Sequence, residues 1–167
     1  VVQPDALLLY APYLGHDAPT VKPASGDWVS VSIKRWIGLT MINNLGISAF
    51  NDLPVLVFNR PESWDDELQV DSYSYRMAVN FAPNAYKKDI ANIRVPTLVM
   101  VGENDESFYP EQFAPLFESS EIDINVHVIP NANHMGIVDT TGANQRLIKW
   151  FNALSTSQLS MVAHSQQ

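Results

Sequence analysis

The sequence predicts an α/β fold in which three parallel strands with flanking helices form a sheet and a long insertion interrupts it. Short, continuous apolar runs are typical of strands that are buried on both faces, as in parallel sheets. Between residues 95 and 154, such strands alternate with amphipathic helices, which is the layer pattern of α/β proteins. Residues 13–92 do not follow this rhythm and therefore indicate an insertion.

Three strands are expected in the sheet. The first covers residues 6–10, an apolar run that ends before Pro12. The second covers residues 96–102, which begin with Pro and end with Gly, two residues that interrupt regular structure. The third, residues 122–129, alternates apolar with polar residues, as a half-buried or edge strand does. A helix that connects two parallel strands requires a right-handed crossover.

Two helices are expected after the second strand. The first covers residues 110–119, with Pro110 at the first helical position, where proline is tolerated. The second covers residues 142–154, and its apolar side chains recur at helical spacing: Leu147, Ile148, Phe151 and Leu154. Residues 155–167 are polar and are expected to form a flexible tail.

The insertion is expected to be a cap or lid between two sheet strands. It is rich in Trp, Tyr and Phe, with a predicted helix at residues 31–47 and a strand or buried loop at residues 54–58. Aromatic side chains more often form a core than a pocket, but a cap of this composition would also suit an apolar acyl or aromatic group, with Trp36 and Phe50 as candidates. The expected organisation is residues 1–12 as first core strand, 13–92 as cap, 93–154 as core and 155–167 as tail.

The bulk composition excludes several classes of protein. A net charge of −8 with only ten scattered Lys and Arg residues argues against a nucleic-acid partner. Because the chain has no cysteine, disulfides, thiolate chemistry and Cys-based zinc sites are excluded. The apolar runs are far shorter than the roughly 20 residues of a membrane-spanning helix, and no signal peptide is visible. The compartment stays undetermined, with a soluble cytoplasmic protein favoured.

Two polar loops follow predicted strands and are the candidate site. Residues 102–108 contain Asp105, and residues 130–136 contain His134. In an open α/β sheet, ligands bind at the carboxyl ends of the strands, where both loops would lie. A carboxylate that orients a histidine is the basis of general-base catalysis, because it fixes the tautomer and stabilises the imidazolium.

Other interpretations of these residues stay open. Asp105 could be a turn or capping carboxylate, since Asp is common after strands for that reason, and a lone His134 could be structural. Glu103 and Glu106 flank Asp105 and are expected to be solvated.

The remaining histidines are weaker candidates. His16 and Asp17 precede Pro19 and more simply form a turn than line a cleft. A metal site that combined them with His134 would have no recognised ligand spacing, so no metal and no cofactor are expected. His127 is expected to be a packing or surface residue of the third strand, and His164 falls in the tail.

The two loops resemble those of the α/β-hydrolases. Residues 95–105 (VPTLVMVGEND) are similar to the strand and acid loop of that family, and residues 131–138 (NANHMGIV) to its histidine loop. Residues 10–19 and 74–83 resemble segments of bacterial lysophospholipase-like members that carry a cap. The resemblance covers roughly residues 5–154 and implies the C-terminal part of an α/β-hydrolase. It makes Asp105 the triad acid and His134 the triad base, in the acid-then-histidine order of the family.

The nucleophile of the family is missing from the sequence. No G-x-S-x-G motif is present, and the nearest segment, residues 46–50 (GISAF), has Phe50 where the strained turn needs a small residue. No clear strand leads into Ser48, and no oxyanion loop is apparent either. The first strand would also have an unpaired edge, which proteins normally cover. The chain is therefore expected to be inactive alone and to need a partner: the rest of the same polypeptide, a second chain or a second copy.

The resemblance implies a serine hydrolase that cleaves a carboxylic ester or an amide, of the esterase or lysophospholipase type, with a small-molecule ester or lipid as substrate. The first alternative is a non-catalytic interaction module derived from a hydrolase. The second is an independent domain that binds a small ligand, although no Gly-rich phosphate loop opens a helix here. A self-contained hydrolase would require a reactive Ser48.

Overall fold

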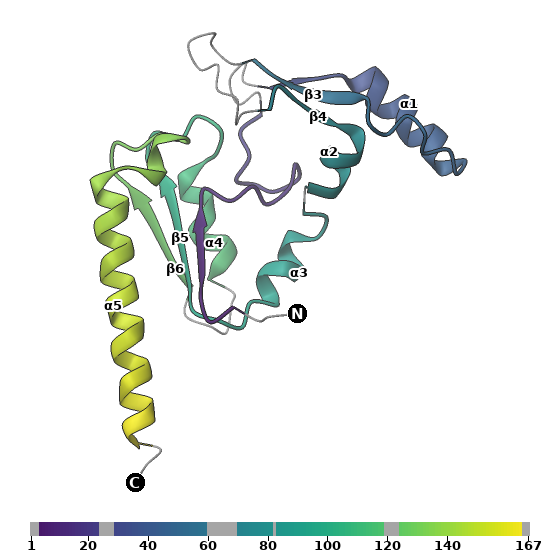
Figure 1. The fold of residues 1–167 in the computed structure, drawn as a ribbon. Coiled ribbons are helices and arrows are strands. Elements are labelled where there is room, and N and C mark those ends of the chain that lie inside the picture. The colour runs from purple at the N-terminus through teal and green to yellow at the C-terminus, as the bar shows by residue number, and fades with distance from the viewer. Residues whose placement is uncertain (1–3, 24–28, 60–69, 82, 119–123, 165–167) are drawn as a thin grey trace. The chain divides into compact units, whose positions relative to one another are not determined.

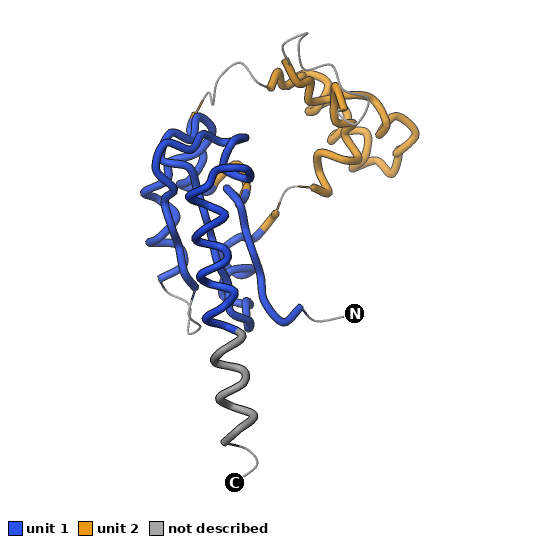
Figure 2. The backbone as a smooth tube through the Cα atoms, turned by 60° about the vertical axis from the view of Figure 1, so that its left-hand side comes forward, with its two compact units in different colours: residues 1–12, 18–22, 85–167 blue, residues 13–17, 23–84 orange. Residues whose placement is uncertain are grey.

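The chain forms two compact units, which are described separately from a computed structural model (Figure 2). The description covers residues 4–23, 29–59, 70–81, 83–118 and 124–164, with the helical backbone alone for 155–164. The sheet unit consists of residues 1–12, 18–22 and 85–167, and the insertion unit of residues 13–17 and 23–84. The expected insertion, residues 13–92, differs from this division at two places, because residues 18–22 and 85–92 pack with the sheet unit.

A three-stranded parallel sheet is the centre of the sheet unit (Figure 1). Its strands are β1 (Leu7–Tyr10), β5 (Thr97–Gly102) and β6 (Ile124–Ile129), in the order β1-β5-β6. Both pairings are parallel, with Leu7 opposite Thr97 and Thr97 opposite Ile124. The predicted α/β architecture is therefore confirmed. Residues 122–123 of the predicted third strand lie outside the described residues.

Burial explains the sequence patterns of the three strands. Every residue of β5 is buried, which accounts for its continuous apolar run. Every residue of β1 is only partly buried, and β6 is partly buried over most of its length. These strands flank β5, and each has one neighbour among the strands that the structure describes. In the described part of the chain, the sheet thus has a buried central strand and two flanking strands with one neighbour each.

Helices of the sheet unit follow the strands in the predicted alternation. They are α3 (Tyr86–Ala91), η3 (Pro110–Gln112), α4 (Phe113–Phe117), η4 (Gly136–Val138) and α5 (Thr141–His164). The predicted helix at 110–119 is split into a 3₁₀ turn that begins at Pro110 and a short α-helix. Helix α5 continues ten residues past its predicted end, over residues expected to be a flexible tail. Nothing in the sequence stops it, because no Gly or Pro follows Gly142.

The core of the sheet unit joins the sheet to α5. Leu98 and Met100 of β5 are fully buried with Ile129, Ala132, Ile137 and Ala143, and Leu147 and Trp150 of α5 pack against this cluster. Burying one such large apolar side chain contributes about 1.5–3 kcal/mol. Ala132 and Ile137 belong to the loop region after β6, so the core itself anchors that loop.

The insertion unit has a small antiparallel sheet, with strands β2 (Val29–Val31), β3 (Pro54–Phe58) and β4 (Ser72–Ser74), and the helices α1 (Ile33–Asn44) and α2 (Tyr75–Phe81). Its core contains Leu39, Val55, Tyr75 and Ala78. The predicted helix and the strand at 54–58 are both present. Trp36 packs against the core with its ring 6.0 Å from that of Tyr75, whereas Phe50 is 54% exposed.

None of the described helices is long and apolar enough to cross a bilayer.

Candidate active site

The loops after β5 and β6 lie side by side and are joined through their backbones. The N–H of Glu103 donates to the carbonyl of Ile129, and that of Asn104 to Ala132, both at 2.9 Å. We call residues 102–108 the acid loop and residues 130–136 the histidine loop. Because parallel neighbouring strands end at the same edge of the sheet, these bonds bring Asp105 and His134 together, as the sequence predicts.

The backbone of both loops requires particular residues. A Cβ atom at Gly102 would lie 2.4 Å from the carbonyl oxygen of Ala132, so only glycine allows the histidine loop to pass this close. Asn131 has a φ of 58°, in the left-handed region that Asn tolerates better than most residues. The side-chain oxygen of Asn133 accepts the N–H of Gly136 at 2.7 Å and closes the loop.

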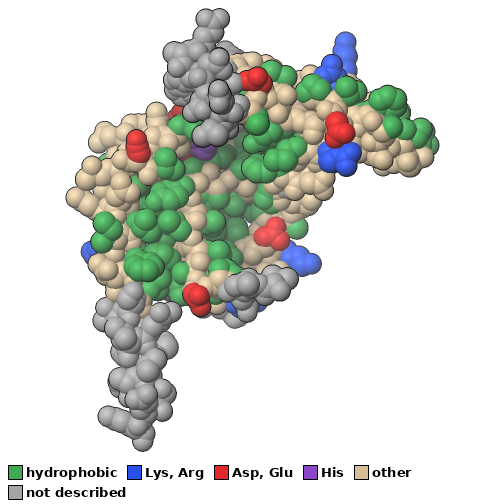
Figure 3. Space-filling model, in the orientation of Figure 1, with side chains coloured by type: hydrophobic (Ala, Val, Ile, Leu, Met, Phe, Trp, Pro, Cys, Tyr) green, Lys and Arg blue, Asp and Glu red, His purple; other side chains and the backbone are tan. Residues whose placement is uncertain are grey.

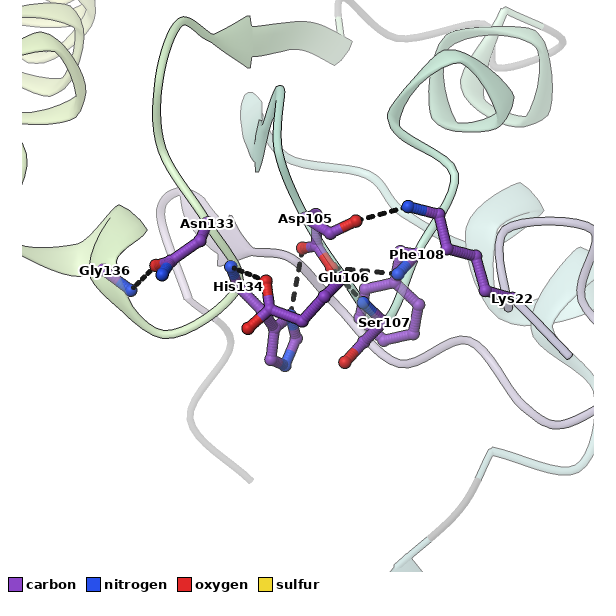
Figure 4. A network of polar contacts seen from close by, with 8 residues as sticks. All are labelled: Lys22, Asp105, Glu106, Ser107, Phe108, Asn133, His134 and Gly136. Carbon is purple, nitrogen blue, oxygen red and sulfur yellow. Dashed lines mark hydrogen bonds and ion pairs between the residues drawn. The ribbon is translucent and has the colours of Figure 1, made fainter. Parts of the chain in front are cut away.

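Asp105 is fully buried, and both of its carboxylate oxygens have partners (Figure 4). Oδ1 accepts the N–H groups of Ser107 and Phe108, each at 2.9 Å. Oδ2 lies 3.0 Å from Nδ1 of His134. The turn and the site interpretations of Asp105 are therefore compatible, since one oxygen caps the turn and the other faces the imidazole. A carboxylate buried this deeply needs such partners, because burying an unpaired charge is very costly.

His134 presents one ring nitrogen, Nδ1, to Asp105 and is partly exposed. Its side chain is 28% exposed, and its ring packs edge-on against Phe108 at 5.1 Å between ring centroids. Because an ionised carboxylate can only accept hydrogen bonds, we assign the proton of the neutral imidazole to Nδ1. Nε2 is then free to accept a proton, which is the role of the base in a catalytic triad.

The surroundings shift the pKa of both groups toward the charged pair. Burial raises the pKa of Asp105, but the hydrogen bond and charge of His134 and the two backbone N–H donors together lower it below its usual range. The hydrogen bond to Asp105 raises the pKa of His134, burial opposes this, and the charges of Asp105 and Glu106 raise it further. The net result for His134 is a pKa above the ordinary value of 6.5.

Asp105→Asn is expected to lower the pKa of His134, because it removes both the charge and the main hydrogen-bond acceptor of the imidazole. Titration of the His134 ring signals by NMR measures this shift. Asp139→Asn is the matched control, since Asp139 follows the histidine loop but does not contribute to the pKa of His134. Equal His134 pKa values in wild type and Asp105→Asn would contradict the observed pairing.

The same pair links stability to pH. The contribution of Asp105 is present above its unfolded pKa, about 3.9, and is lost as pH falls through its lowered folded pKa. The contribution of His134 is complete below its unfolded pKa, about 6.5, and is lost as pH rises through its raised folded pKa. The pair therefore stabilises the protein most between the unfolded pKa of Asp105, about 3.9, and the unfolded pKa of His134, about 6.5.

Sequence reasoning missed the role of the two flanking glutamates. Glu103 is exposed, as expected, whereas Glu106 is partly buried. Each also accepts a backbone N–H of the histidine loop at 3.0 Å, from Asn131 and His134 respectively. Among the described residues, Asp105 is the carboxylate whose side chain contacts the imidazole. Spacing in the sequence could have indicated these bonds. Glu103 and Asn131 are 28 residues apart, as are Glu106 and His134, which nearly equals the 29 residues between Asp105 and His134.

Residues 18–22, expected within the insertion, support the acid loop. The N–H of Tyr109 donates to the carbonyl of Thr20 at 2.8 Å, and that of Lys22 to Ser107 at 3.1 Å. The ammonium of Lys22 donates to the backbone carbonyl of Asp105 and lies 5.5 Å from the centre of the Tyr109 ring. These contacts join residues 18–22 to the acid loop and to the residue that follows it.

The other candidates from the sequence lie elsewhere. Ser48 is in the insertion unit, in the loop between α1 and β3. A helix rather than a strand precedes it, so it does not meet the strand–turn–helix requirement of a nucleophile elbow. His16 and Asp17 form a turn in the same unit. His127 lies in β6, where burial and then the charges of Arg146 and Lys149 lower its pKa.

Two further questions from the sequence concern metals and the tail. Among the residues that the structure describes, no group of three or more His, Cys, Asp or Glu side chains could hold a metal ion. The side chain of His164 lies outside the described part of the chain.

The parallel sheet, its flanking helices and the Asp105–His134 pair after successive strands match part of an α/β-hydrolase fold. The chain therefore has a partial α/β-hydrolase fold, and the resemblance noted in the sequence is confirmed at the level of the fold. No protein-family model matches the sequence, and no curated protein matches it significantly.

A solved structure supports this fold assignment. The chain is similar to the crystal structure of Paleococcus ferrophilus monoacylglycerol lipase, with a TM-score of 0.52 and 20% identity over 87% of this chain. It is also similar to a Bacillus subtilis protein proposed to be a hydrolase, with a TM-score of 0.43 and 23% identity over 88% of this chain. The fold assignment rests on the lipase. The chain spans 58% of the length of the lipase and 51% of that of the Bacillus subtilis protein.

Proposed function

We propose that Asp105 and His134 are the acid and the base of a serine-hydrolase triad whose nucleophile lies outside residues 1–167. The observation that carries this proposal is the 3.0 Å contact between Nδ1 of His134 and a carboxylate that is fully buried and ionised. A buried acid, an imidazole with one free nitrogen and a raised histidine pKa are the features that a general base of this kind requires.

In the proposed reaction, Nε2 of His134 removes the proton from a serine hydroxyl as that oxygen attacks the ester carbonyl. Asp105 keeps the imidazole oriented and stabilises the imidazolium that forms. His134 then gives the proton to the departing alcohol, which leaves an acyl-enzyme. A water molecule, deprotonated by His134, attacks the acyl group, and the acid is released with the serine restored.

A carboxylic ester with an apolar acyl group, as in esterases and lysophospholipases, is the proposed substrate. The solved structure that supports the fold is named a monoacylglycerol lipase. The insertion unit, taken by itself, also exposes apolar side chains. Exposed apolar side chains recur at four-residue spacing along helix α1 and at its C-cap: Ile33, Ile37, Met41 and Leu45.

The proposed partner is a segment that carries the nucleophilic serine, from the same polypeptide or from a second chain, and that pairs with β1. The open edge of β1 supports this, since β5 is its one neighbour among the described strands and all four of its residues are partly buried. Hydrophobic side chains also gather over the sheet unit, to which β1 belongs, in the view of Figure 3. A segment that pairs there would cover both the edge and part of this surface.

The second candidate function is a non-catalytic interaction module derived from a hydrolase. The same open edge of β1 favours it, because an edge strand can recruit another chain whatever the fate of the catalytic residues. The two candidates differ in one respect. Asp105 and His134 would be dispensable for an interaction module, whereas a hydrolase requires both.

Hydrolysis of a substrate series tests the proposed function. A preparation with the nucleophile-bearing segment is expected to cleave p-nitrophenyl butyrate and laurate, and to cleave the matching anilides far more slowly. Residues 1–167 alone are expected to cleave none of them, since a triad member and the oxyanion hole would be missing. Hydrolysis by residues 1–167 alone, or no ester hydrolysis by the combined preparation, would contradict the proposal.

A further inference from the structure

His134 is bonded by two consecutive carboxylates of the acid loop (Figure 4). Asp105 contacts its ring at Nδ1, and Oε2 of Glu106 accepts its backbone N–H at 3.0 Å. One carboxylate therefore fixes the direction of the ring, and the other fixes the main chain from which the ring projects. The second contact is not part of the acid–base pair itself.

A third carboxylate holds the start of the same loop. Oε2 of Glu103 accepts the N–H of Asn131 at 3.0 Å, at the residue whose φ of 58° turns the chain into the histidine loop. Glu103 and Glu106 are three residues apart, as are Asn131 and His134. The acid loop thus bonds the backbone of the histidine loop through Glu103 and Glu106, which lie on either side of Asp105 in the sequence.

We infer that Glu106 is a positioning residue for His134, which anchors the backbone of the base and places a second negative charge beside its ring. The inference rests on the proposed function, which makes His134 the base. A hydrogen bond to an ionised acceptor is roughly twice as strong as a neutral one. Small displacements of a catalytic group are costly, about a hundredfold in rate for 1 Å, so such an anchor has a direct effect on catalysis.

The charges around the imidazole agree with this role. Asp105 and Glu106 both raise the pKa of His134, and their effects are opposed by burial. Lys22, from residues 18–22, bonds the backbone carbonyl of Asp105, and Glu103 acts on the backbone of Asn131; neither contributes to the pKa of His134. Glu106 therefore favours the imidazolium, the form that His134 takes during the proposed reaction.

Three variants of the full chain separate these effects. Glu106→Gln keeps an oxygen that can accept the N–H of His134 but removes the charge, and Glu106→Ala removes both. Glu103→Gln is the matched control, because it makes the same chemical change at the other anchor. The measurements are the NMR titration of the His134 ring and the hydrogen exchange of its backbone amide.

Glu106→Gln is expected to lower the pKa of His134 and to leave the hydrogen-exchange protection of the His134 backbone amide unchanged. Glu106→Ala is expected to lower the pKa as well and to reduce this protection about tenfold or more. Glu103→Gln is expected to leave both at the wild-type level. An unchanged pKa in Glu106→Gln, or an equal decrease in Glu103→Gln, would overturn the inference. If Glu106→Ala does not fold, the two isosteric glutamine variants still decide it.

These readouts do not need a nucleophile, so they remain informative whether or not the protein is a hydrolase. A lowered pKa in Glu106→Gln together with no ester hydrolysis in any preparation would remove the proposed function and leave the anchoring of His134 intact. Ester hydrolysis by the combined preparation, together with an unchanged His134 pKa in Glu106→Gln, would support the proposed function and remove the role of Glu106.

Discussion

His134→Ala is expected to lower kcat for ester hydrolysis by about 10⁶-fold, in a preparation that contains the nucleophile-bearing segment. Without the imidazole, nothing removes the serine proton or protonates the departing alcohol. Asp105→Asn is expected to lower kcat by about 10⁴-fold, because the imidazole loses its orientation and its favoured tautomer. KM should change little in both variants, since neither side chain is proposed to bind the ground-state ester. Steady-state kinetics with a p-nitrophenyl ester measure both effects.

His127→Ala is the matched control for the loss of an imidazole. His127 lies in β6 opposite Met100, and it is not among the groups that shift the pKa of Asp105. Activity should therefore stay near the wild-type level in this variant. If His134→Ala retained wild-type kcat, or if His127→Ala lost as much activity, His134 would not be the base.

Gly102→Ala is expected to lower the free energy of unfolding by about 1–3 kcal/mol or more, the usual range for forcing a methyl group into a packed site. Its Cβ would lie 2.4 Å from the carbonyl oxygen and 2.8 Å from the carbonyl carbon of Ala132. Both are backbone atoms, so the whole histidine loop would have to move. Urea unfolding followed by circular dichroism measures the change, and the pKa of His134 should fall as the loop moves away from Asp105.

Gly38→Ala is the control for this substitution. Gly38 lies within helix α1, and nothing is within 4 Å of the Cβ position. Alanine is favoured over glycine inside a helix by about 1 kcal/mol, so this variant should be slightly more stable than wild type. Wild-type stability of Gly102→Ala, with an unchanged His134 pKa, would show that the loops do not pass as closely as described.

The sheet and the central pair of the site could be predicted from the sequence because their signals are local. A strand buried on both faces needs a continuous apolar run, and β5 has one at every position. Asp105 lies in the loop after β5 and His134 in the loop after β6, so the parallel pairing of these two neighbouring strands is sufficient to bring them together.

The supporting contacts could not be predicted, because they depend on how distant segments pack. Lys22 and Asp105 are 83 residues apart, and no pattern around Lys22 indicates that residues 18–22 return to the acid loop. The antiparallel sheet of the insertion unit has two strands of only three residues, too short for a recognisable alternation. The bonds of Glu103 and Glu106 to the histidine loop could not be predicted either, because they depend on where the backbone of that loop lies.

Labelling with a fluorophosphonate probe, analysed by intact mass, tests most directly whether this chain supplies the acid and base to a serine that lies elsewhere. Residues 1–167 alone should gain no adduct. In a preparation with the nucleophile-bearing segment, a serine of that segment should be labelled, and His134→Ala should abolish the labelling. An adduct on residues 1–167 themselves, mapped to Ser48 or another serine, would contradict a split triad, and labelling that persists in His134→Ala would contradict the role of the base.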